Sequence, residues 1–110
     1  MVGSGITRLL KSRGYEDVIT RTHAELDLLN QAAVHTFLNT EKPDYIFIAA
    51  AKVGGIQANN IYRADFIYQN LMIECNLTHG AYQAGINNLM SLGSSCIYPR
   101  DCPQPIKEEY

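Results

Sequence analysis

The sequence predicts an α/β fold built on a parallel sheet, and two observations support this prediction. Segments with helical spacing of apolar residues alternate with short β-like segments along the 110 residues, and the connections between them are short. Residues 45–50 are apolar throughout, which is typical of a parallel strand covered on both faces. With 46% hydrophobic and 18% charged residues, the composition is that of a globular domain rather than a disordered segment.

The first part of the chain is expected to form two helices and one short strand. Apolar residues at helical spacing predict a helix over residues 4–13. The β-branched run at residues 18–20 predicts a strand. Asn30 is expected to cap a helix over residues 31–40, and this helix stops before Pro43 because proline disfavours helical backbone in the preceding residue.

The second part of the chain is expected to repeat the strand–helix alternation. A buried strand over residues 45–50 is followed by a loop at 52–60 and by a long helix at 63–83 with a wide apolar face. A further strand is predicted at 89–92. Residues 98–105 contain three of the four prolines and are expected to be irregular.

Several classes of partner and site are not expected. The net charge of −2 and the lack of a basic cluster argue against nucleic acid as a partner. The longest apolar run is far too short to cross a membrane. The spacing of Cys75, Cys96 and Cys102 fits no zinc pattern, so no metal is expected, and an odd number of cysteines suggests a reducing, cytoplasmic location.

Small and polar residues follow both of the later strands. Residues 49–55 are three alanines, a lysine, a valine and two glycines, which allow a flat ligand to approach the backbone. Ser94, Ser95 and Cys96 follow the next strand. Because the carboxyl ends of parallel strands share one edge, both segments are expected at the edge where ligands bind. A close-packed strand end and a turn of small residues remain alternative interpretations of these residues.

Three motifs taken together have a more specific likeness. They are Ala-Ala-Ala-Lys-Val-Gly-Gly-Ile at 49–56, Asp-Phe-Ile-Tyr-Gln-Asn at 65–70 and Gly-Ser-Ser-Cys-Ile-Tyr-Pro at 93–99. In this order the chain resembles the GDP-L-fucose synthase family, a branch of the extended short-chain dehydrogenases/reductases. The resemblance extends from Met1 to Tyr110.

The resemblance implies a Rossmann-type doubly wound parallel sheet that is incomplete in these residues. Residues 1–110 would form part of an NADP(H)-binding domain, without its first strand, its C-terminal part or the substrate domain. The implied activity is 3,5-epimerisation of GDP-4-keto-6-deoxy-D-mannose followed by NADPH-dependent reduction of the 4-keto group to GDP-L-fucose. The full-length protein is expected to be a cytoplasmic homodimer. The Tyr-x-x-x-Lys pair of the family is absent from this sequence, so the chain alone is expected to be inactive.

The resemblance also implies roles for individual residues. Ser94 would contact the 4-keto oxygen, and Cys96 would be the acid/base of epimerisation. His23 stands where relatives usually have an arginine near the adenosine 2′-phosphate, and Arg21 is the alternative cation. The implied cofactor contacts are Gly3, His23, Ala24, Glu25, Leu26, Asp27, Leu28, Leu92, Gly93, Ser94 and Ser95.

Other interpretations remain open on sequence alone. The chain could be a non-catalytic Rossmann-type nucleotide-binding or interaction module, or part of another nucleotide-sugar epimerase or dehydratase. Outside the motifs, Cys75 is expected in the core and Asn70 is expected to hydrogen-bond backbone nearby. His35 and His79 are not expected to be catalytic.

Overall fold

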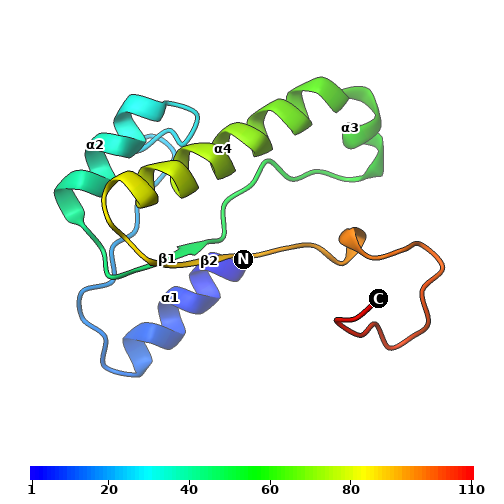
Figure 1. Cartoon of the computed structure of the whole chain (residues 1–110), viewed down its shortest axis with the longest axis horizontal. Coiled ribbons are helices and arrows are strands. Elements are labelled where there is room, and N and C mark those ends of the chain that lie inside the picture. Colours follow the sequence, from blue (N-terminus) through cyan, green and yellow to red (C-terminus); the bar gives the residue numbers. More distant parts are fainter.

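A computed structural model describes all 110 residues of the chain. Its helices pack around a small parallel sheet. The elements are α1 (Val2–Ser12), α2 (Gln31–Glu41), β1 (Tyr45–Ile48), α3 (Ile56–Ile61), α4 (Arg63–Gln83), β2 (Asn88–Ser91) and the 3₁₀ turn η1 (Ser95–Ile97). Figure 1 shows α2 and α4 on one side of the two strands, α1 on the other side, and the C-terminal tail extending away from them. The predicted α/β class with a parallel sheet is therefore confirmed.

The two strands form a short parallel ladder. Tyr45 is opposite Asn88, and the register continues to the pair Ile48 and Ser91. One further bond, from the Leu92 N–H to the Ile48 carbonyl at 3.3 Å, extends the ladder past the end of β2. The strands are joined through α3 and α4, as a parallel pair requires a long crossover.

The core lies between α2, α4 and the sheet. Its buried members are Val34 and Leu38 from α2, Ile48 from β1 and Leu77 from α4. Asn76 is also buried, and its amide donates to the carbonyl of Leu28 at 2.8 Å, so this polar side chain is paired within the core.

The helix ends follow local chemistry that the sequence makes visible. The Asn30 side chain accepts the Ala33 N–H at 3.1 Å, which confirms Asn30 as the cap of α2. α2 ends at Glu41, and its C-cap residue Lys42, directly before Pro43, has a left-handed φ of 42°. The bounds of α4 agree with the predicted 63–83, and the expected strand at 89–92 is displaced by one residue to Asn88–Ser91.

Two predicted elements are wrong. Residues 18–20 form no strand, because a strand needs a neighbour to take up its backbone N–H and C=O groups and none lies beside this run. The expected loop at 52–60 contains α3, whose N-cap is Gly55.

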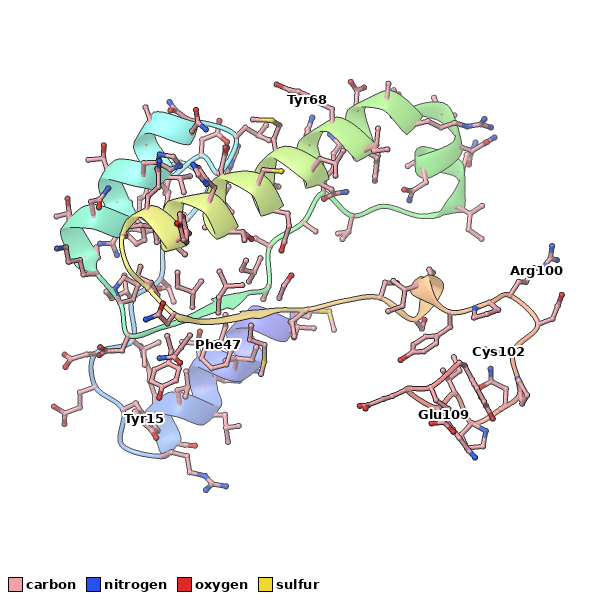
Figure 2. All side chains as sticks on the ribbon, in the orientation of Figure 1. Tyr15, Phe47, Tyr68, Arg100, Cys102 and Glu109 are labelled. Atoms are coloured by element: carbon pink, nitrogen blue, oxygen red, sulfur yellow. The ribbon has the colours of Figure 1, made fainter.

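Fewer apolar side chains are buried than the sequence pattern predicts. Ile48 is buried but Tyr45 and Phe47 are exposed, so β1 is not covered on both faces. Figure 2 shows Phe47 and Tyr15 on the side of the sheet where α1 lies. On α4, Ile67 and Leu71 are exposed, and so is Cys75, because the side of α4 that meets α2 and the sheet passes through Asn76, Leu77 and Ala81 instead. No helix combines the length and apolar content that crossing a membrane would need.

Candidate functional site

A hollow of about 280 Å³ lies at the carboxyl ends of the two strands. It is lined by Val2, Ile48, Ala49, Ala50, Ala51, Asn70, Ile73, Glu74, Ser91 and Leu92. These residues come from the start of α1, the ends of β1 and β2, and one side of α4. This is the edge of an open parallel sheet where ligands bind, and it is the edge that the sequence predicts.

The first turn of α1 packs against the end of β1. A Cβ built on Gly3 would lie 3.4 Å from the Ala49 Cβ, so the two backbones are in close contact. The first hydrogen bond of α1 runs from the Gly5 N–H to the Met1 carbonyl at 3.1 Å, which leaves the N–H groups of the preceding residues free. Free N–H groups at a helix start are suited to a phosphate.

The segment that follows β1 presents unpaired backbone to the hollow. The peptide N–H and C=O groups of Ala49, Ala50 and Ala51 form no hydrogen bond within the chain. Directly after them, Asn70 accepts the Lys52 N–H at 2.8 Å and donates to the Lys52 carbonyl at 3.1 Å. The prediction that Asn70 hydrogen-bonds backbone is therefore confirmed.

Ser94 and Cys96 are brought together directly after β2. Ser94 is the N-cap of η1, and its Oγ accepts the Cys96 N–H at 3.2 Å. Because this oxygen accepts that bond, its own O–H remains available as a donor. The Cys96 thiol is exposed and unpaired. Of the predicted residues 92–96, only Leu92 lines the hollow.

The predicted cofactor segment 23–28 lies at a different place, beside α2. Glu25 and Leu26 line a second hollow of about 560 Å³, together with residues of α2. His23 is exposed, with its Nδ1 3.9 Å from the Asp27 carboxylate. Leu26 and Leu28 also pack against the core. The two hollows share no lining residue, and neither is lined by Ser94 or Cys96.

A turn with a strong carboxylate acceptor precedes α2. The Glu25 carboxylate accepts the Thr22 N–H at 2.7 Å and the Thr22 hydroxyl at 2.8 Å. These bonds, the backbone one first, lower the pKa of Glu25 from its ordinary value because they stabilise the charged form. The negative charge of Glu25 therefore lies within the segment at 23–28.

Arg21, the alternative cation of the sequence analysis, is already engaged. Its guanidinium is 2.9 Å from the Glu41 carboxylate and lies 5.2 Å from the centre of the Phe37 ring. Glu41 thus balances its charge. The sequence gives no sign of this pair, because Glu41 is 20 positions away at the end of α2.

The comparison with protein families decides the wider assignment. All of residues 1–110 match the NAD dependent epimerase/dehydratase family. This chain belongs to that family. Similar proteins include GDP-L-fucose synthase 1 of Arabidopsis thaliana and the GDP-L-fucose synthase of Escherichia coli (strain K12), each 56% identical to this chain over 108 residues. The resemblance seen in the sequence is therefore confirmed.

Solved structures of similar proteins agree with the fold. DdhaC has a TM-score of 0.92 at 54% identity, and its match covers 98% of this chain and 31% of that one. A GDP-mannoheptose C4 reductase from Campylobacter jejuni with NADP bound has a TM-score of 0.90 at 42% identity, over 98% of this chain and 34% of the reductase. The predicted Rossmann-type class is confirmed for this family member.

The matches cover nearly all of this chain but only a part of each relative. The two GDP-L-fucose synthases are covered over 33% and 34% of their own residues, although 98% of this chain is matched in each case. This member of the epimerase/dehydratase family thus spans about a third of the length of the curated relatives it matches. Sequence reasoning missed Glu74 as a lining residue; the only signal for it is its place one helical turn after Asn70.

Proposed function

We propose that residues 1–110 form part of the NADP-binding Rossmann domain of a GDP-L-fucose synthase. The main support is the placement of Ser94 and Cys96, side by side after β2, in a chain that is 56% identical to two proteins of that name. The reaction is 3,5-epimerisation of GDP-4-keto-6-deoxy-D-mannose and reduction of its 4-keto group. The remaining two thirds of such an enzyme would contribute the Tyr-x-x-x-Lys pair, so this chain alone is inactive.

The residues present fit a dinucleotide cofactor. The free N–H groups at the start of α1 suit a phosphate, and the unpaired backbone of the small residues Ala49 to Ala51 lines the same hollow together with Leu92. NADPH, when bound, supplies the hydride for the 4-keto carbon. The cofactor contacts Gly3, Leu92, Gly93, Ser94 and Ser95 belong to this end. The contacts at residues 23–28 belong to the hollow beside α2, where the Arg21 guanidinium is paired with Glu41 and His23 lies 3.9 Å from the Asp27 carboxylate.

Ser94 holds the keto oxygen of the substrate. Its Oγ accepts the Cys96 N–H, which directs the hydroxyl proton outward to a substrate acceptor. When a proton leaves the carbon next to the ketone, negative charge develops on that oxygen as an enolate. A hydrogen bond donor placed there lowers the free energy of the enolate.

Cys96 moves the proton during epimerisation. As a thiolate it removes the acidified C–H proton from one face of the carbon next to the ketone, and an acid on the other face returns a proton to that carbon. The configuration inverts when removal and return occur on opposite faces, which requires a second acid/base group from outside this chain. The thiol is exposed and forms no disulfide, so it is accessible to a substrate at the edge of the sheet.

Exposed apolar side chains on α4 and the unpaired thiols bear on the assembly and the compartment of the full-length protein. Ile67, Tyr68 and Leu71 give α4 an exposed side with large apolar groups, which supports a homodimer formed through this helix. Three unpaired thiols support a reducing compartment, the cytoplasm.

The test is a chimera in which this chain replaces the matching third of the Escherichia coli GDP-L-fucose synthase. The chimera is expected to oxidise NADPH in the presence of GDP-4-keto-6-deoxy-D-mannose and to yield GDP-L-fucose. Cys96→Ser should reduce solvent-deuterium incorporation at C3 and C5 by about 100-fold or more, with NADPH binding little changed. Cys75→Ser, which changes another exposed thiol, is the matched control and should have no effect.

Two results would contradict the proposal. A folded chimera that binds NADPH but leaves this substrate unchanged would assign the chain to another nucleotide-sugar enzyme of the family. Undiminished deuterium incorporation in Cys96→Ser would show that Cys96 is a small residue in a tight turn and has no acid/base role.

A further inference from the structure

His35 has a buried ring nitrogen without a hydrogen-bond partner. This residue lies on the side of α2 that meets α4. Among the buried and half-buried residues of the chain, its Nε2 is the only buried side-chain nitrogen or oxygen that forms no hydrogen bond. The other ring nitrogen, Nδ1, is not enclosed in this way, so solvent can bond to it. Since buried polar atoms are normally paired, the unpaired Nε2 restricts which form of the ring fits this place.

The Cδ2–Nε2 edge of the ring packs closely against α4. A Cβ built on Gly80 would lie 2.9 Å from the His35 Cδ2, 3.3 Å from its Nε2 and 2.9 Å from a Leu38 methyl group. Gly80 and Leu38 are both buried, so this edge of the ring is enclosed between the two helices.

The side chains of α4 that face His35 offer no negative charge. The ring of His79 lies 6.0 Å from the His35 ring, and the uncharged phenol of Tyr82 stacks on His79 at 6.2 Å. No carboxylate oxygen lies within 4.0 Å of a nitrogen of either histidine ring.

The acidic groups of the surrounding elements are engaged elsewhere. Glu25 accepts two hydrogen bonds from Thr22, and Asp27 lies beside His23. At the end of α2, Glu41 pairs with Arg21. On α4, Glu74 accepts the Ser91 hydroxyl. A positive charge on His35 is therefore left without a partner.

A second proton on the His35 ring is costly in this setting. In the neutral ring one nitrogen carries the hydrogen, and with that hydrogen on Nδ1 the buried Nε2 holds only a lone pair. In the charged ring both nitrogens carry hydrogen, so an Nε2 N–H would be buried without an acceptor. Burial of an unpaired charge adds to this cost, and a protonated His79 would repel it from 6.0 Å.

We propose that His35 makes the contact between α2 and α4 acid-sensitive. Histidine changes its charge between about pH 5 and 8. Because the packed helices favour the neutral ring, the contact is strongest where the ring is neutral and weakens as the pH falls. The segment before α2 is affected too, since the Asn76 amide of α4 holds the Leu28 carbonyl. This proposal depends on the fold alone and not on the proposed function.

Hydrogen exchange of the α2 amides in the chimera measures the strength of the contact. After correction for the intrinsic effect of pH on exchange, the protection of the Val34 and Leu38 amides should fall about tenfold from about pH 7.5 to about pH 5.5. The Glu25 carboxyl does not contribute to this change, because the bonds from Thr22 lower its pKa from the ordinary value of 4.5, away from this range.

Two variants of His35 and one matched control assign the effect. His35→Gln and His35→Leu cannot take up the second proton, so their α2 protection should be equal within about twofold at the two pH values. His23→Gln is the control, the same substitution at an exposed histidine that has no part in this contact. It should retain the tenfold fall.

Several results would overturn the proposal. One is unchanged α2 protection in the unsubstituted chimera, and another is a fall that persists in His35→Gln. If the His35 variants do not fold, nitrogen NMR of the imidazole rings in the unsubstituted chimera decides. The neutral His35 ring should carry its hydrogen on Nδ1 and gain its second proton over the range in which α2 loses protection. A hydrogen on Nε2, or a ring that stays neutral while α2 loosens, contradicts the proposal.

Discussion

Gly80 tests how closely α2 and α4 must approach. It is a buried residue within α4, and a Cβ built there would lie 2.9 Å from the His35 ring and 2.9 Å from a Leu38 methyl group. Both contacts are shorter than real Cβ contacts, so Gly80→Ala requires α2 to move or its side chains to leave their packed positions. Leu38 is a core residue with almost no exposed surface, which leaves it little room to respond.

Two opposing effects set the size of the change. Alanine favours a helix interior over glycine by about 1 kcal/mol. Overpacking in a close-packed core costs about 1–3 kcal/mol. With two short contacts to packed side chains, the steric cost should exceed the gain in helix propensity, and we expect Gly80→Ala to lower the free energy of unfolding by about 1 kcal/mol.

Gly5 in α1 provides the matched control. A Cβ built on Gly5 meets no atom within 4 Å, so Gly5→Ala gains the propensity without the clash and should raise the free energy of unfolding by up to about 1 kcal/mol. The assay is urea unfolding of the two chimera variants by circular dichroism, with midpoints compared at unchanged slope. If Gly80→Ala stabilises the protein as much as Gly5→Ala does, the close approach of α2 and α4 is not a constraint.

Two further predictions concern the segment before α2. Asn76→Ala should lower the free energy of unfolding by about 1–3 kcal/mol, because the Leu28 carbonyl loses its donor within the core; urea unfolding measures this, and an unchanged midpoint would contradict it. The Glu25 carboxyl should titrate below its ordinary value of 4.5 in an NMR titration, because Thr22 donates two bonds to the charged form. Since the folded pKa is the lower one, this contribution to stability is present above the unfolded pKa and is lost as the pH falls through the folded pKa. Thr22→Ala should move the titration back toward 4.5, and an identical midpoint in that variant would refute the assignment.

The parts of the fold that were predicted correctly are those fixed by local chemistry. The cap at Asn30 and the full extent of α4 depend on residues close in the chain, and both are confirmed. The strand expected at 18–20 is wrong because β-branched residues form a strand only where a neighbouring strand takes up their backbone groups. α3 was missed because Gly54 and Gly55, which indicate a turn, lie directly before it and conceal a helix of only six residues.

In the candidate site too, contacts between residues close in the chain could be predicted, whereas contacts between distant residues could not. The proximity of Ser94 and Cys96 follows from two positions of separation and is present in the structure. The pair of Arg21 with Glu41 is not visible in the sequence, because contacts 20 positions apart depend on how the elements pack. For Asn70, a polar residue on an apolar helix indicated a backbone partner, but only the packing of α4 shows that this partner is Lys52.

The parallel ladder also determines the order in which the domain can gain stability. Asp44 and Asn88 meet at its start, where the Asn88 amide donates to the Asp44 carbonyl across 44 positions of chain. Closing so long a connection has an entropic cost that a ladder of four residue pairs repays only in part. α4 shortens the effective connection, because once helical it is a rod that docks on α2 through Leu77 and Gly80. We therefore expect strand pairing to follow the docking of α4 on α2, so that the ligand-binding edge forms only when the rest of the unit is in place.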